Sequence, residues 1–351
     1  MIVALANSFT EEMSVRKKVL ALLLLAAAAV LAVTGCASNP AAQPKAEKAE
    51  KKVIIGYTPW TGYGALFIAK EKGYFKSRGL DVELQSIEGV GDRKQSLVAN
   101  RIQAMAASLD VSVSAAGEGV PMKFVWAFDS SNGADGLIVK QGRGIENVAD
   151  LKGKEVAFHR GSASHFFLST ILEKAGLTDS DIKAVDMKAS EAASAFMAGK
   201  VDAAVTWEPH LSKAVAAGDR VLSTTKDTPG LIADVLAVRE ELVQKDPQTV
   251  QALVDALAEA TDYLNKNPED ANKILAAAFK MKSEDVAADV KTVKFYDLVG
   301  NLEFYGTKEK PGTIFEVGKR AGAFYVNQKI LSQAPDLTKF IDGSFINKAK
   351  K

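Results

Sequence analysis

The same order of segments occurs twice in the folded part of the chain. A strand-like run, a helix-like run, a second strand-like run, a second helix-like run and a further apolar run follow one another from Val53 to Ala107, and the order returns from Glu155 to Thr206. Residues 98–104, VANRIQA, align with residues 197–203, MAGKVDA. Strands that alternate with helices predict a sheet with helical crossovers. We therefore predict an α/β chain with two lobes of like topology; chance similarity of two ordinary βαβ units is the alternative.

The predicted elements also set the bounds of the lobes. They are 53–57, 64–72, 80–84, 93–99 and 102–107 in the first repeat, and 155–158, 163–175, 182–187, 191–198 and 201–206 in the second. Further strand-like runs are 123–128, 136–139 and 234–238, and a helical pattern covers 248–264. We interpret the segments near 129–133 and near Asp234 as two crossings between lobes. Lobe I is then 53–130 and 235–351, the latter with a C-terminal helical region, and lobe II is the insertion 131–234.

The N-terminus has the pattern of an export signal. Arg16, Lys17 and Lys18 precede the apolar run 19–33, which is short for a membrane span. Val-Thr-Gly-Cys at 33–36 resembles the lipobox of bacterial lipoproteins, so we predict a signal peptide at 1–35 and lipidation of Cys36. A plain signal anchor with an incidental cysteine is the alternative. Residues 36–52 are small, charged and contain proline, which predicts a flexible tether.

Composition excludes several classes of partner. The chain holds 44 Lys and Arg against 43 Asp and Glu, and the part after residue 35 is formally neutral, so we expect no nucleic-acid partner. One cysteine rules out an internal disulfide, and three histidines argue against a Cys/His metal cluster. We expect neither a metal nor a cofactor.

Short motifs spread over residues 53–265 are specific as a set. They are GYTPW at 56–60, AKEKGYF at 69–75, GLDVE at 79–83, DLKGK at 150–154, GS at 161–162, AGKVDAA at 198–204, WEP at 207–209 and DVLAVR at 234–239. Together they resemble the nitrate/sulfonate/taurine family of ABC-transporter substrate-binding proteins, a family similar to the thiamine-pyrimidine synthases.

The resemblance implies a type II periplasmic-binding-protein fold, with two α/β lobes joined by two hinge crossings. It also implies a monomer that closes on a small ligand and delivers it to ABC permease and ATPase subunits. The thiamine-pyrimidine synthases of this fold depend on a cysteine-rich motif, which this chain lacks. We therefore expect a binding protein and no enzyme.

Two sets of residues at predicted strand ends are candidates for ligand binding, because ligands of open α/β sheets bind there. The first set is suited to an anion: Arg160 stands beside Ser162, at the predicted N-terminus of a helix. A simple N-cap is the other interpretation of Ser162. His165, one turn further on, we interpret as a packed histidine rather than as a base.

The second set is acidic and aromatic and is suited to a cation. Its members are Trp60, Tyr63, Asp92, Asp110, Trp207, Glu208 and Asp234, with Ser108 on the same predicted loop as Asp110. Each acid alone is also explained as a helix cap or a solvated loop residue.

These residues leave the charge of the ligand open. An amino-sulfonate such as taurine satisfies both sets, a plain sulfonate only the first, and an amine or guanidinium only the second. The predicted function is capture of a small zwitterionic, cationic or sulfonate-type molecule outside the cytoplasm, by a protein anchored through lipid to the cell membrane. The alternatives are a ligand-sensing lipoprotein and a thiamine-pyrimidine-related binding protein or enzyme.

Overall fold

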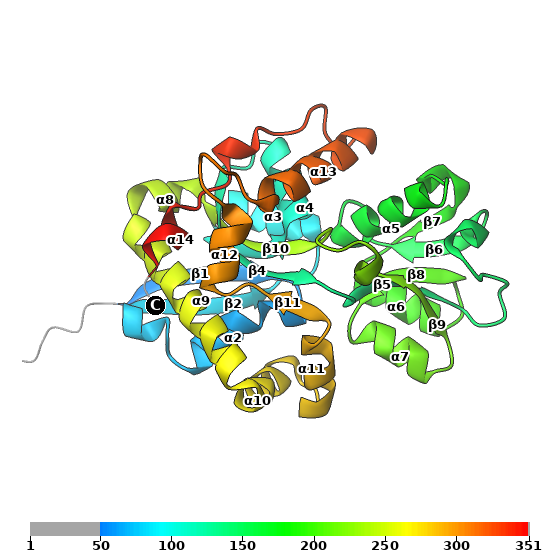
Figure 1. The fold of residues 1–351 in the computed structure, drawn as a ribbon, viewed down its shortest axis with the longest axis horizontal. Coiled ribbons are helices and arrows are strands. Elements are labelled where there is room, and N and C mark those ends of the chain that lie inside the picture. The colour runs from blue at the N-terminus through cyan, green and yellow to red at the C-terminus, as the bar shows by residue number, and fades with distance from the viewer. Residues whose placement is uncertain (1–49, 350–351) are drawn as a thin grey trace, which may run out of the picture. The chain divides into compact units, whose positions relative to one another are not determined.

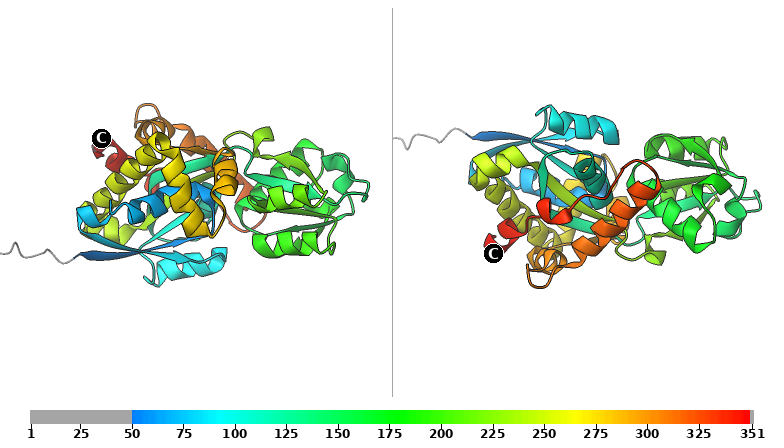
Figure 2. Two further views of the ribbon diagram at one scale, coloured as in Figure 1. Left: turned by 90° about the horizontal axis from the view of Figure 1, so that it is seen from below. Right: turned by 90° about the horizontal axis from the view of Figure 1, so that it is seen from above.

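The computed structural model describes residues 50–349, which form two mixed sheets flanked by helices (Figures 1 and 2). The predicted signal peptide, Cys36 and most of the predicted tether lie outside the described residues. Among the described residues, no helix is long and apolar enough to cross a membrane.

The first sheet belongs to lobe I and has the strand order β11-β4-β10-β3-β1-β2. Its strands are β1 (Lys51–Tyr57), β2 (Leu80–Ser86), β3 (Ala104–Ser108), β4 (Met122–Ser131), β10 (Ala233–Arg239) and β11 (Val293–Phe295). β1 runs parallel to β2 and β3, whereas β10 runs antiparallel to both β3 and β4. The central strands β3 and β10 are almost wholly buried, which explains their near-continuous apolar runs.

The second sheet belongs to lobe II and has the order β7-β6-β8-β5-β9. Its strands are β5 (Asp135–Val139), β6 (Glu155–Phe158), β7 (Lys183–Asp186), β8 (Ala203–Trp207) and β9 (Arg220–Thr224). β6 is parallel to β7 and β8, and β5 is antiparallel to β8 and β9. A separate small core that includes Ile138, Phe196 and Leu211 lies between this sheet and its helices.

The helices cover both sheets and connect the parallel strands (Figure 1). Those of lobe I before the insertion are α2 (Gly64–Glu71), α3 (Val90–Val98) and α4 (Leu109–Gly117), and those of lobe II are α5 (Ala163–Lys174), α6 (Ala189–Met197) and α7 (His210–Ala216). The C-terminal region adds α8 (Glu240–Lys245), α9 (Pro247–Lys266), α10 (Pro268–Phe279), α11 (Ser283–Val290), α12 (Leu298–Tyr305), α13 (Thr313–Asn327) and α14 (Ser344–Lys348). Within lobe I, α9 packs on α2 and α13 packs on α4.

The predicted two-lobed α/β fold is confirmed, with small shifts at the bounds. β1 begins at Lys51, inside the segment predicted as tether, because Lys51 pairs with Leu80 and Lys52 forms an ion pair with Glu83. β4 continues to Ser131, so the first part of the predicted crossing 129–133 is still strand. The chain therefore crosses to lobe II only after Ser131. The return crossing ends where β10 begins, at Ala233.

Candidate ligand-binding cleft

A cleft lies between the two lobes, with a cavity volume of about 50 Å³. Lobe I lines it with Thr58, Trp60, Tyr63, Glu88, Val90, Arg93, Ser108, Val111, Ile232 and Asp234, and lobe II with Asp135, His159, Ser162, Ala163 and Trp207. Most of these residues follow the carboxyl ends of strands or begin helices, as ligand sites in open α/β sheets do.

The floor of the cleft in lobe I is acidic. Asp234 lies at the start of β10, opposite Asp129 of β4, and accepts a hydrogen bond from the Tyr63 hydroxyl. Burial, together with the charges of Asp135 and Asp110, raises the pKa of Asp234 to about 8. Asp129 is fully buried behind it and receives the Trp60 indole N–H at 3.3 Å. Burial and the charge of Asp234 likewise raise the pKa of Asp129.

Gly62 makes this arrangement possible. A Cβ atom at Gly62 would overlap both the Asp129 carboxylate and the Trp60 indole nitrogen. The short 3₁₀ turn at Thr61–Tyr63 therefore brings Trp60 and Tyr63 close to the two acids only because residue 62 has no side chain.

Lobe II contributes a further buried acid, Asp135, the first residue of β5. Its side chain is 3 % exposed, and its Oδ2 atom has no hydrogen-bond partner among the described residues. Burial raises the pKa of Asp135 to about 7; a hydrogen bond from Ser131 opposes this shift and the charge of Asp110 adds to it.

A buried arginine faces the same cleft. Arg93, on α3, is 3 % exposed and donates through one terminal nitrogen to the Ile87 carbonyl at 2.6 Å. Its Nε has no partner, and it forms no ion pair with a carboxylate of the described residues. Burial lowers the pKa of the guanidinium from its ordinary value, but arginine stays protonated in proteins. Asp234, Tyr63 and Glu88 are near enough to favour its charge.

The N-terminus of α5 also points into the cleft. Gly161 has φ of 66°, a left-handed conformation that glycine adopts without strain, and it turns the chain from β6 into the helix. Ser162 occupies the N-cap position, yet its hydroxyl donates to the His159 carbonyl at 2.7 Å and does not cap the helix. The first N–H groups of α5 therefore have no intrahelical acceptor and are suited to an anion.

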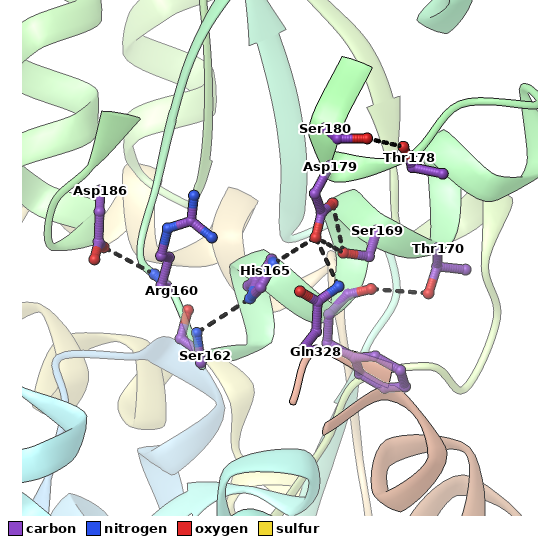
Figure 3. Close-up of polar contacts among 12 residues, drawn as sticks. Arg160, Ser162, His165, Ser169, Thr170, Thr178, Asp179, Ser180, Asp186 and Gln328 are labelled. Atoms are coloured by element: carbon purple, nitrogen blue, oxygen red, sulfur yellow. Dashed lines mark hydrogen bonds and ion pairs between the residues drawn. The ribbon is translucent and has the colours of Figure 1, made fainter. Parts of the chain in front are cut away.

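His165 belongs to a structural network and not to a nucleophile–base pair (Figure 3). Its Nδ1 accepts the Gly161 N–H at 3.2 Å, so its Nε2 carries the proton and donates to Asp179 at 2.9 Å. Ser169 and Gln328 donate to the same carboxylate, at 2.9 and 2.7 Å. Burial alone would raise the pKa of Asp179, but these hydrogen bonds outweigh burial and lower it.

Direct contacts hold the lobes together at the edges of the cleft. Glu88 of lobe I accepts hydrogen bonds from the hydroxyl and the N–H of Ser190 in lobe II, at 2.7 and 3.3 Å. On α13, the Tyr325 hydroxyl donates to Asp110 of lobe I at 2.9 Å and to the Gly161 carbonyl of lobe II at 3.1 Å. The described conformation is therefore one in which the lobes touch.

The structure brings six of the predicted site residues to the cleft: Trp60, Tyr63, Ser108, Ser162, Trp207 and Asp234. Asp110 is buried next to it and bonded to Tyr325. The other three do not line it. Asp92 is exposed on the first turn of α3, the exposed Arg160 guanidinium lies over the Phe158 ring, and Glu208 accepts hydrogen bonds from Ser212 at the start of α7.

Sequence analysis missed Arg93, Asp135, Glu88 and His159. Glu88 lies between the predicted strand 80–84 and the predicted helix 93–99, Arg93 begins that helix, and Asp135 follows the predicted crossing 129–133. Nearness to these predicted strand and helix ends was the available signal. No group of acids, histidines or cysteines suited to a metal ion occurs among the described residues. The cleft offers buried carboxylates, a guanidinium, a helix N-terminus and aromatic faces, which are means of holding a charged small molecule.

The NMT1/THI5-like family matches residues 60–271. The chain belongs to this family. A putative aliphatic sulfonates-binding protein of Bacillus subtilis (strain 168) is 24% identical over 333 residues, 93% of this chain and 96% of the relative.

Solved structures share the fold. The alkanesulfonate-binding protein SsuA from Xanthomonas axonopodis pv. citri, bound to MOPS, has a TM-score of 0.70 at 21% identity, covering 85% of this chain and 100% of that one. The desulfurization enzyme DSZB has a TM-score of 0.64 at 18% identity, covering 84% of this chain and 98% of that one. Both binding proteins and an enzyme are thus built on this fold.

Proposed function

We propose that this protein is an extracytoplasmic solute-binding protein that captures a small charged molecule, with a taurine-like amino-sulfonate as the first candidate, and delivers it to an ABC importer. The observation that carries the proposal is the cleft between two lobes, lined from both sides by buried groups of opposite charge. Family membership and the names of the sulfonate-binding relatives support the same role.

Binding without catalysis is part of the proposal. The Ser162 hydroxyl is bonded to a carbonyl, and both nitrogens of His165 are engaged with Gly161 and Asp179. A hydrolytic nucleophile would need its base within hydrogen-bond reach. The cleft residues therefore act by holding the ligand, and the lobes separate and close to admit it.

A ligand panel tests the binding role. The full chain, purified in detergent, is heated with amino-sulfonates, alkanesulfonates, amines, guanidino compounds, nitrate and thiamine precursors. We expect one class to raise the melting temperature, because a ligand that binds only the folded state stabilises it. If no class does so, the binding role is contradicted. Loss of uptake of the best ligand on deletion of the gene, with rescue by the wild-type gene, tests delivery to an importer.

The membrane anchor is a separate proposal, and it depends on Cys36. The Val-Thr-Gly-Cys order after the apolar run is the feature that supports lipidation and attachment to the outer face of the cell membrane. Cys36→Ser is expected to release the protein from membranes or to leave the signal uncleaved. Fractionation identical to that of the wild type would contradict the anchor and leave the binding role intact.

A further inference from the structure

Helix α13 is the element of lobe I that holds the start of α5 in lobe II. It packs on α4 within lobe I, and its C-cap residue Gln328 donates to Asp179 of lobe II at 2.7 Å (Figure 3). The Phe324 ring centre lies 5.0 Å from that of His165 and 5.1 Å from that of Phe166, both on α5. These contacts cross from one lobe to the other, so they break when the lobes separate.

One hydroxyl of α13 lies between the two lobes. The Tyr325 oxygen is 2.9 Å from Oδ2 of Asp110, at the start of α4, and 3.1 Å from the carbonyl oxygen of Gly161 in lobe II. Burial and the charge of Asp110 raise the pKa of Tyr325, so the hydroxyl keeps its proton. A tyrosine hydroxyl has one proton to donate, whereas an ionised carboxylate and a carbonyl are both acceptors. One of the two acceptors therefore lacks a full hydrogen bond unless Asp110 itself carries a proton.

A protonated Asp110 supplies the missing hydrogen atom. Its O–H donates to the Tyr325 oxygen, and the Tyr325 hydroxyl is then free to donate to Gly161. Asp110 is 2 % exposed, and its Oδ1 has no hydrogen-bond partner among the described residues. Burial raises the pKa of Asp110 above its ordinary value, although the Ser108 and Tyr325 hydroxyls and the first N–H groups of α4 favour the ionised form.

Separated lobes need one proton fewer. Tyr325 and Asp110 stay together because α13 packs on α4, whereas Gly161 moves away with lobe II. The Tyr325 proton then serves the Asp110 carboxylate alone. Given the lobe movement that the proposed function requires, on which this step rests, we infer that Tyr325 and Asp110 form a proton-linked latch: closure takes up one proton from solvent at Asp110, because the Gly161 carbonyl takes over the Tyr325 hydrogen bond.

The latch gives closure a pH dependence of known sign. The pKa of Asp110 is higher in the closed form than in the open form, so the latch favours closure at low pH and this effect is lost as the pH rises through the closed-form pKa. Uptake of one proton changes the ratio of closed to open molecules by at most about tenfold per pH unit. Other ionisable groups also lie near the latch, namely Asp135, Asp234, His165 and Glu118 with its partner Lys94. Variants of the latch residues separate its contribution from theirs.

Nitroxide labels on the two lobes measure this ratio without any ligand. Val98 ends α3 in lobe I and Met197 ends α6 in lobe II; both are exposed, and they correspond to each other in the aligned repeats. The full chain carries Val98→Cys and Met197→Cys for labelling, and Cys36→Ser so that no third thiol reacts. Pulsed electron paramagnetic resonance of this parent chain gives the fractions of short, closed and long, open distances between about pH 4.5 and about pH 8.5.

Two substitutions in the parent chain test the two partners of the latch. Asp110→Asn supplies a permanent N–H donor to Tyr325, so we expect a ratio of closed to open molecules at least about tenfold above that of the parent at about pH 8.5. Tyr325→Phe removes the donor to Gly161, so we expect the ratio to fall about fivefold at about pH 4.5, as for loss of one hydrogen bond. Asp81→Asn, at an exposed acid of β2, is the matched control and should follow the parent at every pH. Thermal unfolding confirms that each variant is folded.

Each measurement can contradict the latch. A parent chain whose ratio does not fall as the pH rises overturns the inference, and so does an Asp110→Asn chain that is no more closed than the parent at high pH. Tyr325→Phe gives an independent result if Asp110→Asn does not fold, because a Tyr325→Phe chain as closed as the parent at low pH also overturns the inference. No ligand is present, so these outcomes leave the solute-binding role to the ligand panel. A panel without a binder contradicts that role and leaves the latch measurement as it is.

Discussion

Asp179 and Asp135 are both acids of lobe II, and they differ in what surrounds them. Asp179 receives hydrogen bonds from His165, Ser169 and Gln328, so its charge is compensated and its pKa is lowered. Asp135 is more deeply buried, keeps one oxygen without a partner, and has a pKa raised to about 7. The first acid fastens α5 to α13. The second keeps its Oδ2 atom free of hydrogen bonds from the described residues, so that atom is available to a ligand.

The difference shows that burial alone does not identify a functional acid. A compensated carboxylate stabilises the fold, whereas an uncompensated one weakens it and persists where a ligand supplies the missing partner. Removal of the two acids is therefore expected to have opposite effects on the ligand-free protein.

The largest effect on stability is expected from Asp179→Ala. The substitution leaves the buried His165 N–H and the donors of Ser169 and Gln328 without an acceptor, so we expect the free energy of unfolding to fall by about 2–4 kcal/mol. Chemical denaturation measures the loss. Asp81→Ala, at an exposed position, is the control and should change stability by less than about 0.5 kcal/mol. Equal losses in the two variants would remove the distinction between Asp179 and a surface acid.

A smaller effect, of opposite sign, is expected from Asp135→Asn and Asp234→Asn. Both carboxyls have a pKa raised above the ordinary value of 3.8, to about 7 and about 8. The folded state therefore holds their protons more tightly than the unfolded state, and their contribution to stability is lost as the pH rises from about 4 through about 8. The asparagine variants cannot lose a proton there, so we expect them to be about 1–3 kcal/mol more stable than the wild type near pH 8.5.

Scanning calorimetry without ligand, at several pH values between about 5 and 8.5, checks this expectation. The difference in melting temperature between variant and wild type should grow with pH, to about 2–6 °C at the upper end. Variants that melt below the wild type at pH 8.5 would mean that the carboxylates are compensated within the protein after all.

The smallest effect is expected from Gln328→Ala, which removes one of the donors to Asp179 and leaves the others in place. We expect a loss of about 0.5–1.5 kcal/mol. Gln328→Glu is a second test, because it places another carboxylate beside Asp179. We expect it to lower the free energy of unfolding by more than Gln328→Ala does. Chemical denaturation of both variants in parallel shows which loses more stability. A larger loss in Gln328→Ala than in Gln328→Glu would show that Gln328 acts through packing alone.

Sequence patterns predicted the repeated strands and helices of both lobes to within a few residues, because apolar periodicity and glycine stops mark them directly. They gave no prediction for α4, α7, β9 and β11. Asp234 and Ser162 were found because strand ends mark ligand sites in this kind of fold. Arg93 was not, because nothing in the spacing of α3 says which face of the helix meets lobe II. Arg160 shows the opposite case: it stands two positions before Ser162 in the sequence, yet its side chain extends over Phe158 and does not line the cleft. The direction of such a side chain depends on how the two lobes pack against each other, and the sequence around one residue does not show this packing.

The pairing of β4 with β10 places Ser130 opposite Ala233, so the chain leaves lobe I and returns to it at neighbouring points. The two ends of the inserted lobe II therefore lie next to each other in lobe I. A segment with adjoining ends can be replaced by a homologous one, or moved to another host, without reordering the strands that remain. Grafting experiments thus have natural cut sites at Gly133 and Ile232, and in evolution the wall that carries Asp135 is exchangeable separately from the wall that carries Arg93.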